Sequence, residues 1–383
     1  FGLQRFGSNP QAATHMMGAA LLRSDFHKVV ELIMTPRPNE RGEELHAKEL
    51  WLRTRDAAEV LKLMPRRMAI ERGVLEGLVK HGATNPLGAL SRLPKQMRSM
   101  YLHAFQSLVF NHAASERVRL YGSHRVVAGD LVATRGTANG GGAGGSADGI
   151  AGGGVGTGAA AAEGFEDTPS SLLDDAAASA EATEDDLVAD AGSGNAEMEV
   201  HAVTEDEAAS GAYTVHDVLL PLPGHKVSMP QHAVADVYAR ILSEWGLDVE
   251  QLGHRVKELA LPGGYRRLLQ KPLNMRWAIL KYDDPTAPLA PTDLTRLRGE
   301  PDPEGVPDGE RTAVRLEFTL PPSTYATMCL RELTKQSTEF AHQMALNERS
   351  VPAAAVEGVA ATDASEQGAA GMKRAREAED GAP

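Results

Sequence analysis

The sequence predicts a fold of the α+β class, with a mostly helical first block and a second block that mixes strands with helices. Two local patterns predict it. Apolar residues recur at helical spacing over residues 97–120, and they alternate with polar residues over 314–320. A length of 383 residues predicts two or three domains. An apolar content of 42% is enough to bury a sizeable core.

The predicted helix over residues 97–120 rests on apolar side chains spaced three or four residues apart. Arg117 and Arg119 come late in the run and Gly122 lies just beyond it, as is typical of a helix C-terminus. The pattern therefore predicts an amphipathic helix whose apolar face comprises Met97, Met100, Tyr101, Ala104, Phe105, Leu108 and Val109.

The predicted strand over residues 314–320 alternates between apolar and polar side chains, so we expect it to be buried on one face. Pro321 and Pro322 end it, and Ser323 or Thr324 is expected to cap the helix that follows. The segment 285–311 is rich in Pro, Asp and Gly, which predicts a surface loop.

Two segments have the composition of disordered chain. Residues 137–210 consist mainly of Gly, Ala, Ser, Asp and Glu, and residues 356–383 are rich in Ala and Glu. The string GVGTGA at 154–159 approximates a dinucleotide-binding motif, but its flanks supply neither the strand nor the helix that the motif requires. The ordered blocks are therefore expected at about 1–136 and 211–355.

Charge is unevenly distributed along the chain, whose net charge is -13. Residues 137–210 hold 16 acidic and no basic residues, whereas residues 1–136 hold 20 basic and 12 acidic residues, a net +8. The ordered part is mildly basic, which permits RNA binding but equally fits a solvated surface. The single cysteine, Cys329, excludes an internal disulfide framework and fits a reducing compartment.

Five strings in order carry a resemblance to a known family. The chain opens with FGLQRFG at residues 1–7, and YLHAFQSLVFN follows at 101–111. GDL at 129–131 and LPG at 222–224 are shorter, and the last string is LPPSTYAT at 320–327 followed by LREL at 330–333. Together they resemble the TruD family of pseudouridine synthases. The sequence around 213–224 and 263–272 resembles its eukaryotic branch.

The resemblance implies an isomerase that converts uridine in RNA to its C5-glycoside without a cofactor. It implies an α+β catalytic core, a mixed sheet with helices, formed by residues 1–26 and 273–355. A family-specific α/β insertion domain is expected at 27–272, with the disordered insert 137–210 inside it and a disordered tail at 356–383. RNA is expected between the two domains. The expected substrate is tRNA, at uridine 13, and the eukaryotic likeness adds other RNAs.

The same resemblance assigns a role to Phe1, which matches the family's base-stacking phenylalanine. Without the motif, Phe1 would be interpreted as a core aromatic residue. The family's essential aspartate precedes this motif, so we expect it upstream of Phe1 and expect the fragment alone to be inactive. Asp25, Asp56 and Asp130 do not lie in a string like the catalytic loop, and Asp130, after Gly129, is interpreted as a turn residue.

Further residues are candidates for binding RNA. Arg331 lies in the last family motif and could pair with the missing aspartate or with a phosphate, although a helix-surface arginine would have the same sequence signal. The helix start at Ser323 and Thr324 could receive a phosphate through free backbone N–H groups. Most helix starts bind only water or their own cap.

A basic and aromatic cluster is expected where Arg266, Arg267 and Lys271 follow Tyr265, a combination that suits an RNA backbone as well as a solvated face. Arg5 is expected to support the loop that carries Phe1. No histidine pair has a metal-ligand spacing, so no metal is expected, and Cys329 is interpreted as a small core residue.

Two other functions stay open. The chain could be an RNA-binding relative that has lost catalysis, or the acidic segment 137–210 could bind a protein partner. No run of 18 apolar residues and no signal-peptide pattern occurs, so a soluble intracellular protein is expected. We also expect it to be a monomer. We expect it in the nucleus or cytoplasm, with the nucleus favoured by the weak basic patch at 373–376. Because the chain opens at Phe1, its natural start is expected further upstream.

Overall fold

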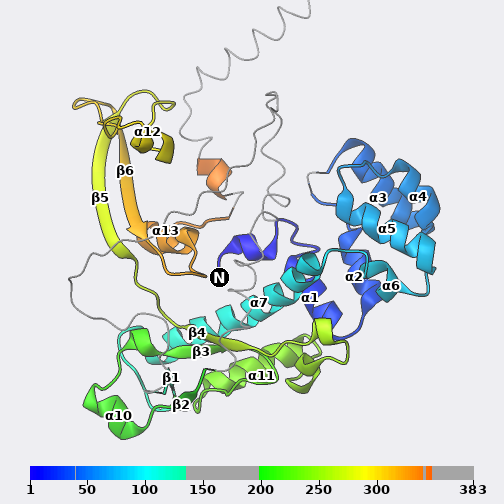
Figure 1. Cartoon of the computed structure of the whole chain (residues 1–383), viewed down its shortest axis with the longest axis horizontal. Coiled ribbons are helices and arrows are strands. Elements are labelled where there is room, and N and C mark those ends of the chain that lie inside the picture. The colour runs from blue at the N-terminus through cyan, green and yellow to red at the C-terminus, as the bar shows by residue number, and fades with distance from the viewer. Residues whose placement is uncertain (39, 135–197, 340–341, 347–383) are drawn as a thin grey trace, which may run out of the picture. The chain divides into compact units, whose positions relative to one another are not determined.

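The computed structural model describes residues 1–38, 40–134, 198–339 and 342–346 (Figure 1). It contains two compact units, Phe1–Tyr325 and Ala326–Pro383. The glycine-rich string at 154–159, the tail at 356–383 and its basic patch lie outside the described residues. Helices and antiparallel strands are both present, which agrees with the predicted α+β class.

The first 121 residues are helical, as predicted. Two of the aspartates considered above begin helices: Asp25 accepts a hydrogen bond from the Lys28 N–H, and Asp56 accepts from the N–H groups of Ala58 and Glu59. The elements are η1 (Leu3–Phe6), α1 (Thr14–Leu22), α2 (Phe26–Ile33), α3 (Gly42–Thr54), α4 (Ala57–Leu63), α5 (Ala69–His81), α6 (Pro86–Leu90) and α7 (Lys95–Tyr121).

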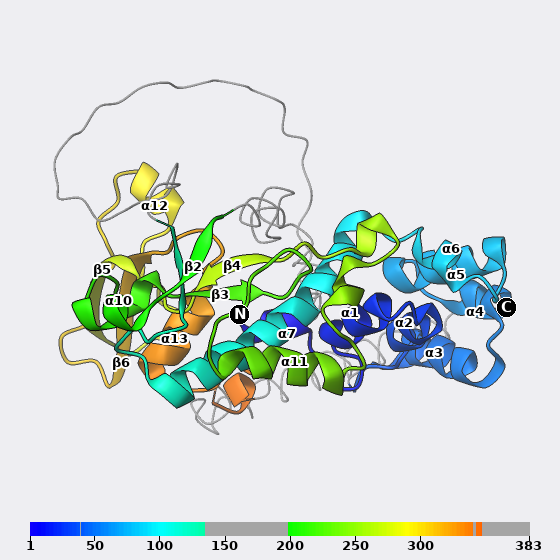
Figure 2. The same cartoon turned by 90° about the horizontal axis from the view of Figure 1, so that it is seen from below.

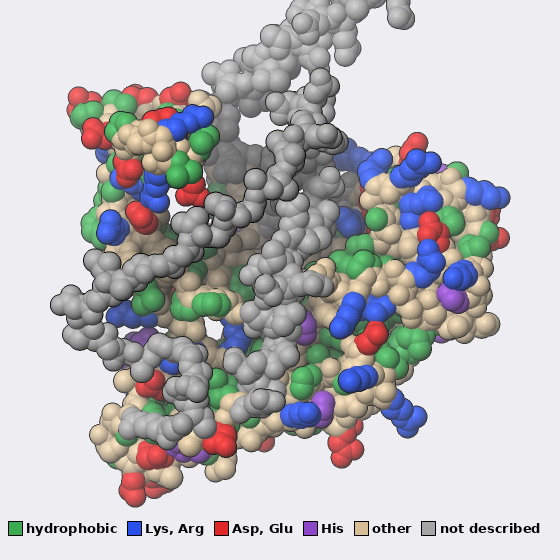
Figure 3. Space-filling model, in the orientation of Figure 1, with side chains coloured by type: hydrophobic (Ala, Val, Ile, Leu, Met, Phe, Trp, Pro, Cys, Tyr) green, Lys and Arg blue, Asp and Glu red, His purple; other side chains and the backbone are tan. Residues whose placement is uncertain are grey.

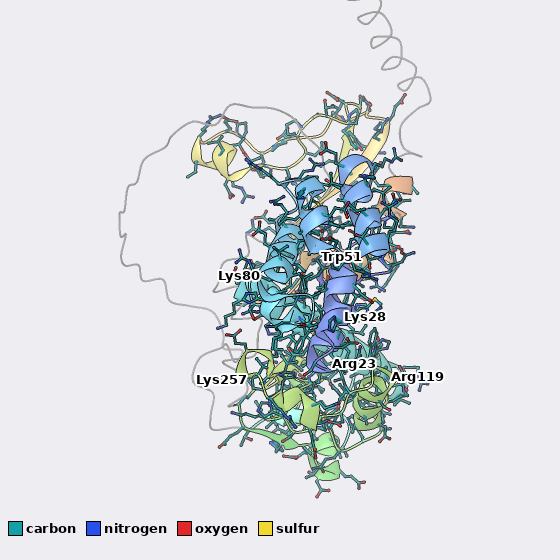
Figure 4. The ribbon with its side chains drawn as sticks, turned by 90° about the vertical axis from the view of Figure 1, so that its right-hand side faces the viewer. Arg23, Lys28, Trp51, Lys80, Arg119 and Lys257 are labelled. Carbon is teal, nitrogen blue, oxygen red and sulfur yellow. The ribbon has the colours of Figure 1, made fainter. Side chains whose placement is uncertain are left out.

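Helix α7 is the longest of these and confirms the helix predicted over 97–120. α1 and α11 (Val234–Glu244) both pack along it, as the two views in Figures 1 and 2 agree. Gly18 sets the distance between α1 and α7, because a Cβ atom there would lie 2.0 Å from the carbonyl oxygen of Tyr101. The main core lies between these helices, and Trp51 is buried among the helices α2–α6 (Figure 4).

A four-stranded antiparallel sheet follows, in the order β2-β1-β3-β4. Its strands are β1 (Leu131–Ala133), β2 (Val200–Ala202), β3 (Leu219–Leu222) and β4 (Gly264–Arg267). The remaining short elements of this region are α10 (Glu205–Ser210), η3 (Val215–Asp217), η4 (Glu250–Gly253) and η5 (Lys257–Leu259). α7 and β3 are in contact, and Leu220 and Leu222 of β3 belong to the core of the helices, whereas other buried residues of the sheet form two smaller clusters.

The turn after β3 explains the LPG string at 222–224. A Cβ atom on Gly224 would lie 2.2 Å from the backbone nitrogen of Gly263, so only glycine fits there. The Gln106 amide of α7 donates a hydrogen bond to the Pro223 carbonyl at 2.8 Å. A buried polar side chain of the long helix is therefore satisfied by this turn.

Part of the segment predicted to be disordered is folded. β2 pairs with β1, and Thr204 begins α10 with a reciprocal capping box to Glu207. For residues 198–210 the prediction of disorder is therefore wrong, because composition does not register the strand pairing and the cap. Residues 137–197 lie outside the described part of the chain.

β5 (Leu273–Tyr282) and β6 (Arg311–Thr319) form a separate antiparallel hairpin, and α12 (Asp293–Leu297) lies in the connection between them. The predicted strand is confirmed. The predicted loop over 285–311 contains the short helix α12 and is mostly exposed, with a few half-buried residues and the buried Gly309. The expectation of one buried face is wrong. Trp277 is 69% exposed and Val314 61% exposed, and both belong to the apolar face of the hairpin.

Asp130 lies in the predicted turn, because its N–H donates to the Val127 carbonyl at 3.1 Å. Its carboxylate also forms a two-point ion pair with Arg117 of α7, at 2.7 and 2.6 Å, and both side chains are 0% exposed. His232 approaches the same carboxylate at 3.1 Å. The sequence predicted the turn and missed the buried pair.

Candidate active site

Phe1 is held at its backbone by one side chain of α7. The Asn111 carbonyl oxygen Oδ1 accepts from the Phe1 nitrogen at 2.9 Å, and the Asn111 amide nitrogen Nδ2 donates to the Phe1 carbonyl at 3.0 Å. An amide side chain that both donates and accepts fixes the backbone of its partner at two points. The position of Phe1 is therefore set by a residue 110 positions away.

The ring of Phe1 lies in a cluster of aromatic and guanidinium groups. The Phe110 ring packs edge to face with it at 5.4 Å, and the Tyr325 ring does so at 6.1 Å. The Cζ atom of Arg266 lies over the Phe1 ring at 4.0 Å from its centroid, and that of Arg5 at 5.6 Å. Such flat aromatic and guanidinium surfaces are the ones on which unstacked bases lie in proteins that bind single-stranded RNA.

Arg266 is partly removed from water at this place. Burial lowers the pKa of its guanidinium to about 10, with Tyr325 acting in the opposite direction and Arg5 in the same one. The side chain also donates to the Ser323 carbonyl and lies 5.9 Å from the Phe110 ring centroid. The Arg266 guanidinium stays charged at neutral pH. Aromatic rings and a backbone carbonyl replace part of the water around it.

The structure brings together three of the residues predicted for RNA binding: Phe1, Arg266 and Ser323. Ser323 contributes its backbone carbonyl, in a left-handed conformation with φ of 60°. The Thr324 hydroxyl donates to the Pro322 carbonyl at 3.4 Å. The following helix α13 (Ala326–Thr334) begins two residues after Thr324, so the proposed cap and phosphate site stay a prediction.

The other predicted residues are arranged differently. Arg267 is exposed and lies 3.7 Å from Asp217, and it also donates to the His216 carbonyl. Lys271 is exposed between β4 and β5. Tyr265 is buried in the sheet, and its hydroxyl accepts from the Ser228 N–H at 2.6 Å. The expected basic and aromatic cluster is thus not one surface, because neighbouring residues of β4 point to opposite faces.

Arg331 and Cys329 lie on α13, in the second unit. Arg331 is exposed, and its position relative to Phe1 stays a prediction. Cys329 is half-buried, and α13 has no buried residue, so the interpretation of Cys329 as a core residue is wrong. An isolated helix does not bury its apolar residues by itself.

The sequence did not assign roles to Asn111, Phe110 and Tyr325, although each lies in a string that carried the resemblance. Asp25, Asp56 and Asp130 have the structural roles described above, two as helix caps and one as a buried ion pair. Within the described ranges no group of His, Cys, Asp or Glu is arranged to hold a metal ion. Among the same residues no helix is long and apolar enough to cross a membrane.

Lys and Arg side chains outnumber acidic ones on the face of α3–α5 seen in Figure 3, but acidic side chains lie among them. Several are paired at the surface, for example Arg67 with Glu44 at 2.6 Å and Arg92 with Glu76 at 3.2 Å. The helical region is therefore mildly basic without forming a patch of one sign.

Comparison with known proteins places this chain in a family. The family model described as tRNA pseudouridine synthase D (TruD) matches residues 1–141 and 159–333. The sequence is 32% identical to mouse "Pseudouridylate synthase 7 homolog" over 91% of this chain and 43% of that protein. It is 35% identical to "Multisubstrate pseudouridine synthase 7" of Schizosaccharomyces pombe over 90% of this chain and 45% of that protein.

A solved structure is also similar. A putative tRNA pseudouridine synthase D (TruD) from Methanosarcina mazei superposes with a TM-score of 0.57 at 22% identity, over 88% of this chain and 60% of that one, which supports the fold. The fold and the family match are those of a pseudouridine synthase. The chain belongs to the TruD family. It spans less than half the length of the curated relatives it matches.

Proposed function

We propose that the full-length protein isomerises uridine to pseudouridine in RNA. In this reaction the bond between C1′ of the ribose and N1 of uracil breaks, the base turns, and a bond forms between C1′ and C5. The hydrogen on C5 is lost as a proton and N1 gains one, so the reaction needs no oxidant or cofactor. The base must first leave its stack, which costs a few kcal/mol that stacking on an aromatic ring can offset.

One observation carries the proposal: Phe1 is held by Asn111 within a group of aromatic and guanidinium side chains. We propose that Phe1 stacks on the flipped uracil and that Ser323, Thr324 and Arg266 line its surroundings. The exposed cations Arg267, Lys271 and Arg331 are proposed to contact the RNA backbone.

We also propose which parts of the chain form each domain. Residues 1–26 and 273–355 belong to the catalytic domain, and 27–272 form the insertion domain. The essential aspartate is contributed by the part of the full-length protein that precedes Phe1. The substrate is tRNA at uridine 13, and other RNAs are further candidates, in line with the name "Multisubstrate pseudouridine synthase 7" of the S. pombe relative. The protein acts as a monomer in the nucleus or cytoplasm.

The test uses full-length protein and a tRNA transcript labelled with tritium at C5 of its uridines. Release of tritium to water reports the loss of the C5 proton. A transcript with cytidine at position 13 is the matched control and should release no tritium at that position. Phe1→Leu should lower the rate by about 10- to 100-fold, because base stacking is worth about 1–3 kcal/mol.

The same assay separates the alternative, a relative that binds RNA without catalysis. Binding of the transcript with no tritium release, and with no pseudouridine in total cellular RNA, would favour that alternative. A deletion of residues 137–197 tests the acidic segment: unchanged tritium release would exclude an essential role for it in the reaction.

A further inference from the structure

The side chain of Arg266 is directed at Phe1 and away from solvent. Its Cζ atom lies 4.0 Å from the Phe1 ring centroid, well within the distance of about 6 Å at which a cation interacts with an aromatic face. The guanidinium also donates to the Ser323 carbonyl. The partners of the group therefore include the ring that is proposed to stack on the substrate base, and the Phe110 ring lies 5.9 Å from the same Cζ atom.

The strand β4 determines this direction. Arg266 pairs with Leu220 and Arg267 pairs with Leu219 in the ladder between β3 and β4, so their side chains lie on opposite faces. Arg267 is exposed and lies 3.7 Å from Asp217, whereas Arg266 is half-buried against Phe1. Two adjacent arginines of one strand thus have different environments, so the effects of substituting each can be compared directly.

Burial supports a role for Arg266 other than phosphate binding. Burial lowers its pKa to about 10, and the Phe1 and Phe110 rings are among the groups that lie next to its guanidinium. A guanidinium whose Cζ atom lies 4.0 Å from a ring centroid and that donates to a backbone carbonyl restricts the movement of that ring. A lysine could keep the charge but not both contacts, because an ammonium group has no flat face and no rigid fork of donors.

We infer that Arg266 is a positioning residue, which fixes the plane of the Phe1 ring before the flipped uracil stacks on it. The inference rests on the proposed function and adds to it that Arg266 acts through Phe1 and not through a phosphate. A ring that is already ordered loses less conformational freedom when the base arrives, so more of the stacking free energy is available for holding the base.

A double-mutant cycle in the full-length protein tests this inference. The variants are Phe1→Leu, Arg266→Gln, their combination, and Arg267→Gln with and without Phe1→Leu. Single-turnover tritium release and the salt dependence of RNA affinity are measured for each. We expect Arg266→Gln to slow the reaction about tenfold, as loss of a partly desolvated cation–π contact would. In the Phe1→Leu background the same substitution should change the rate less than about twofold.

Arg267→Gln gives the contrasting pattern. It should weaken RNA binding to the same extent with and without Phe1→Leu, and it should reduce the slope of log affinity against log salt by about one. Arg266→Gln should leave that slope unchanged. Multiplicative effects of Arg266→Gln and Phe1→Leu, or a reduced salt slope for Arg266→Gln, would overturn the inference.

Two further measurements keep the outcomes distinct. Arg266→Lys at the wild-type rate would show that charge alone is needed and would also overturn the positioning role. If the wild-type protein releases no tritium, the proposed function fails, and the contact is then tested by urea unfolding of the Phe1→Leu and Arg266→Gln cycle. Additive changes in unfolding free energy would contradict the contact, and non-additive changes would support it.

Discussion

Ser323 contributes to the cluster around Phe1 through its backbone conformation and its carbonyl. Its φ of 60° lies in the left-handed region, where a non-glycine residue is uncommon, and its carbonyl accepts from Arg266. Strain of this kind persists where the surrounding structure requires it, and it costs on the order of 1–3 kcal/mol. The residue is thus retained in this conformation next to the cluster around Phe1.

The effect of a Ser323 substitution on the free energy of unfolding should depend on how well the new residue adopts the positive φ angle. Ser323→Gly should leave the free energy of unfolding unchanged or raise it by up to about 1 kcal/mol, because glycine adopts positive φ without strain. Ser323→Val should lower it by about 1–3 kcal/mol, because a β-branched residue is strongly disfavoured there. Urea unfolding of the chain measures both. RNA affinity of Ser323→Ala is the check on the hydroxyl: a loss of affinity would show that it contacts RNA.

His103 of α7 should make stability dependent on pH. Burial, with a smaller contribution from the charge of Arg5, lowers the pKa of His103 to about 4. The unfolded chain binds the proton near pH 6.5 and the folded chain only near pH 4, so the folded state loses stability as pH falls through this window. The loss is at most about 3 kcal/mol at pH 4.

Replacing His103 with leucine should flatten the pH profile of unfolding between pH 6.5 and 4. The measurement is urea unfolding at intervals of pH, with the exposed His81→Gln as the control. An unchanged profile in the His103→Leu variant would show that another group causes the dependence.

Elements with a strong local pattern could be predicted from the sequence, and contacts between distant elements could not. α7 and β6 were predicted within a few residues, because periodicity reports directly which side chains share a face. The pairing of Asn111 with Phe1 and of Arg266 with Phe1 joins residues more than 100 positions apart. No spacing rule encodes such contacts, and only the family strings indicated that these residues belong together.

The burial of the hairpin was predicted incorrectly for a related physical reason. Alternation in β6 identifies the side of the strand that is suited to a core, but it does not say that residues of this chain cover it. Composition failed similarly at α10, where a capping box stabilises a helix in a segment of low complexity. In both cases the contacts that determine the structure are not encoded in the local pattern or composition of the segment.

The ion pair between Arg117 and Asp130 connects α7 to the turn that precedes β1. Asp130→Ala should lower the free energy of unfolding by about 3–5 kcal/mol, because it leaves a buried guanidinium without the carboxylate that balances its charge. The double variant Arg117→Met, Asp130→Ala should lose less than the sum of the two single variants.

Chemical denaturation of the three variants measures this coupling. Arg119→Met is the matched control, since Arg119 is on the same helix and its ion pair with Glu116 is exposed at the arginine side. We expect the control to unfold close to the wild type, as exposed ion pairs contribute little. Additive losses for Arg117 and Asp130 would contradict a coupled buried pair.

At the scale of the whole molecule, charge is segregated along the chain. The first 136 residues have a net charge of +8, whereas the segment 137–210 has 16 acidic residues and no basic ones. The overall charge of -13 therefore does not describe the surface that would meet RNA. Salt screens charges that lie more than about a Debye length apart, so the local charge of the surface that contacts RNA matters more than the net charge of the chain.

The hairpin β5–β6 presents an apolar face, and a two-stranded sheet normally needs a covering layer to be stable. The chain has three tryptophans, and Trp277 at the centre of this face is 69% exposed while Trp51 is 5% exposed. The hairpin thus carries its own fluorophore. Iodide should quench Trp277 emission in the 383-residue chain, and Trp277→Phe should remove most of that quenching. A blue shift of the same emission in the full-length protein would report that the apolar face has become covered.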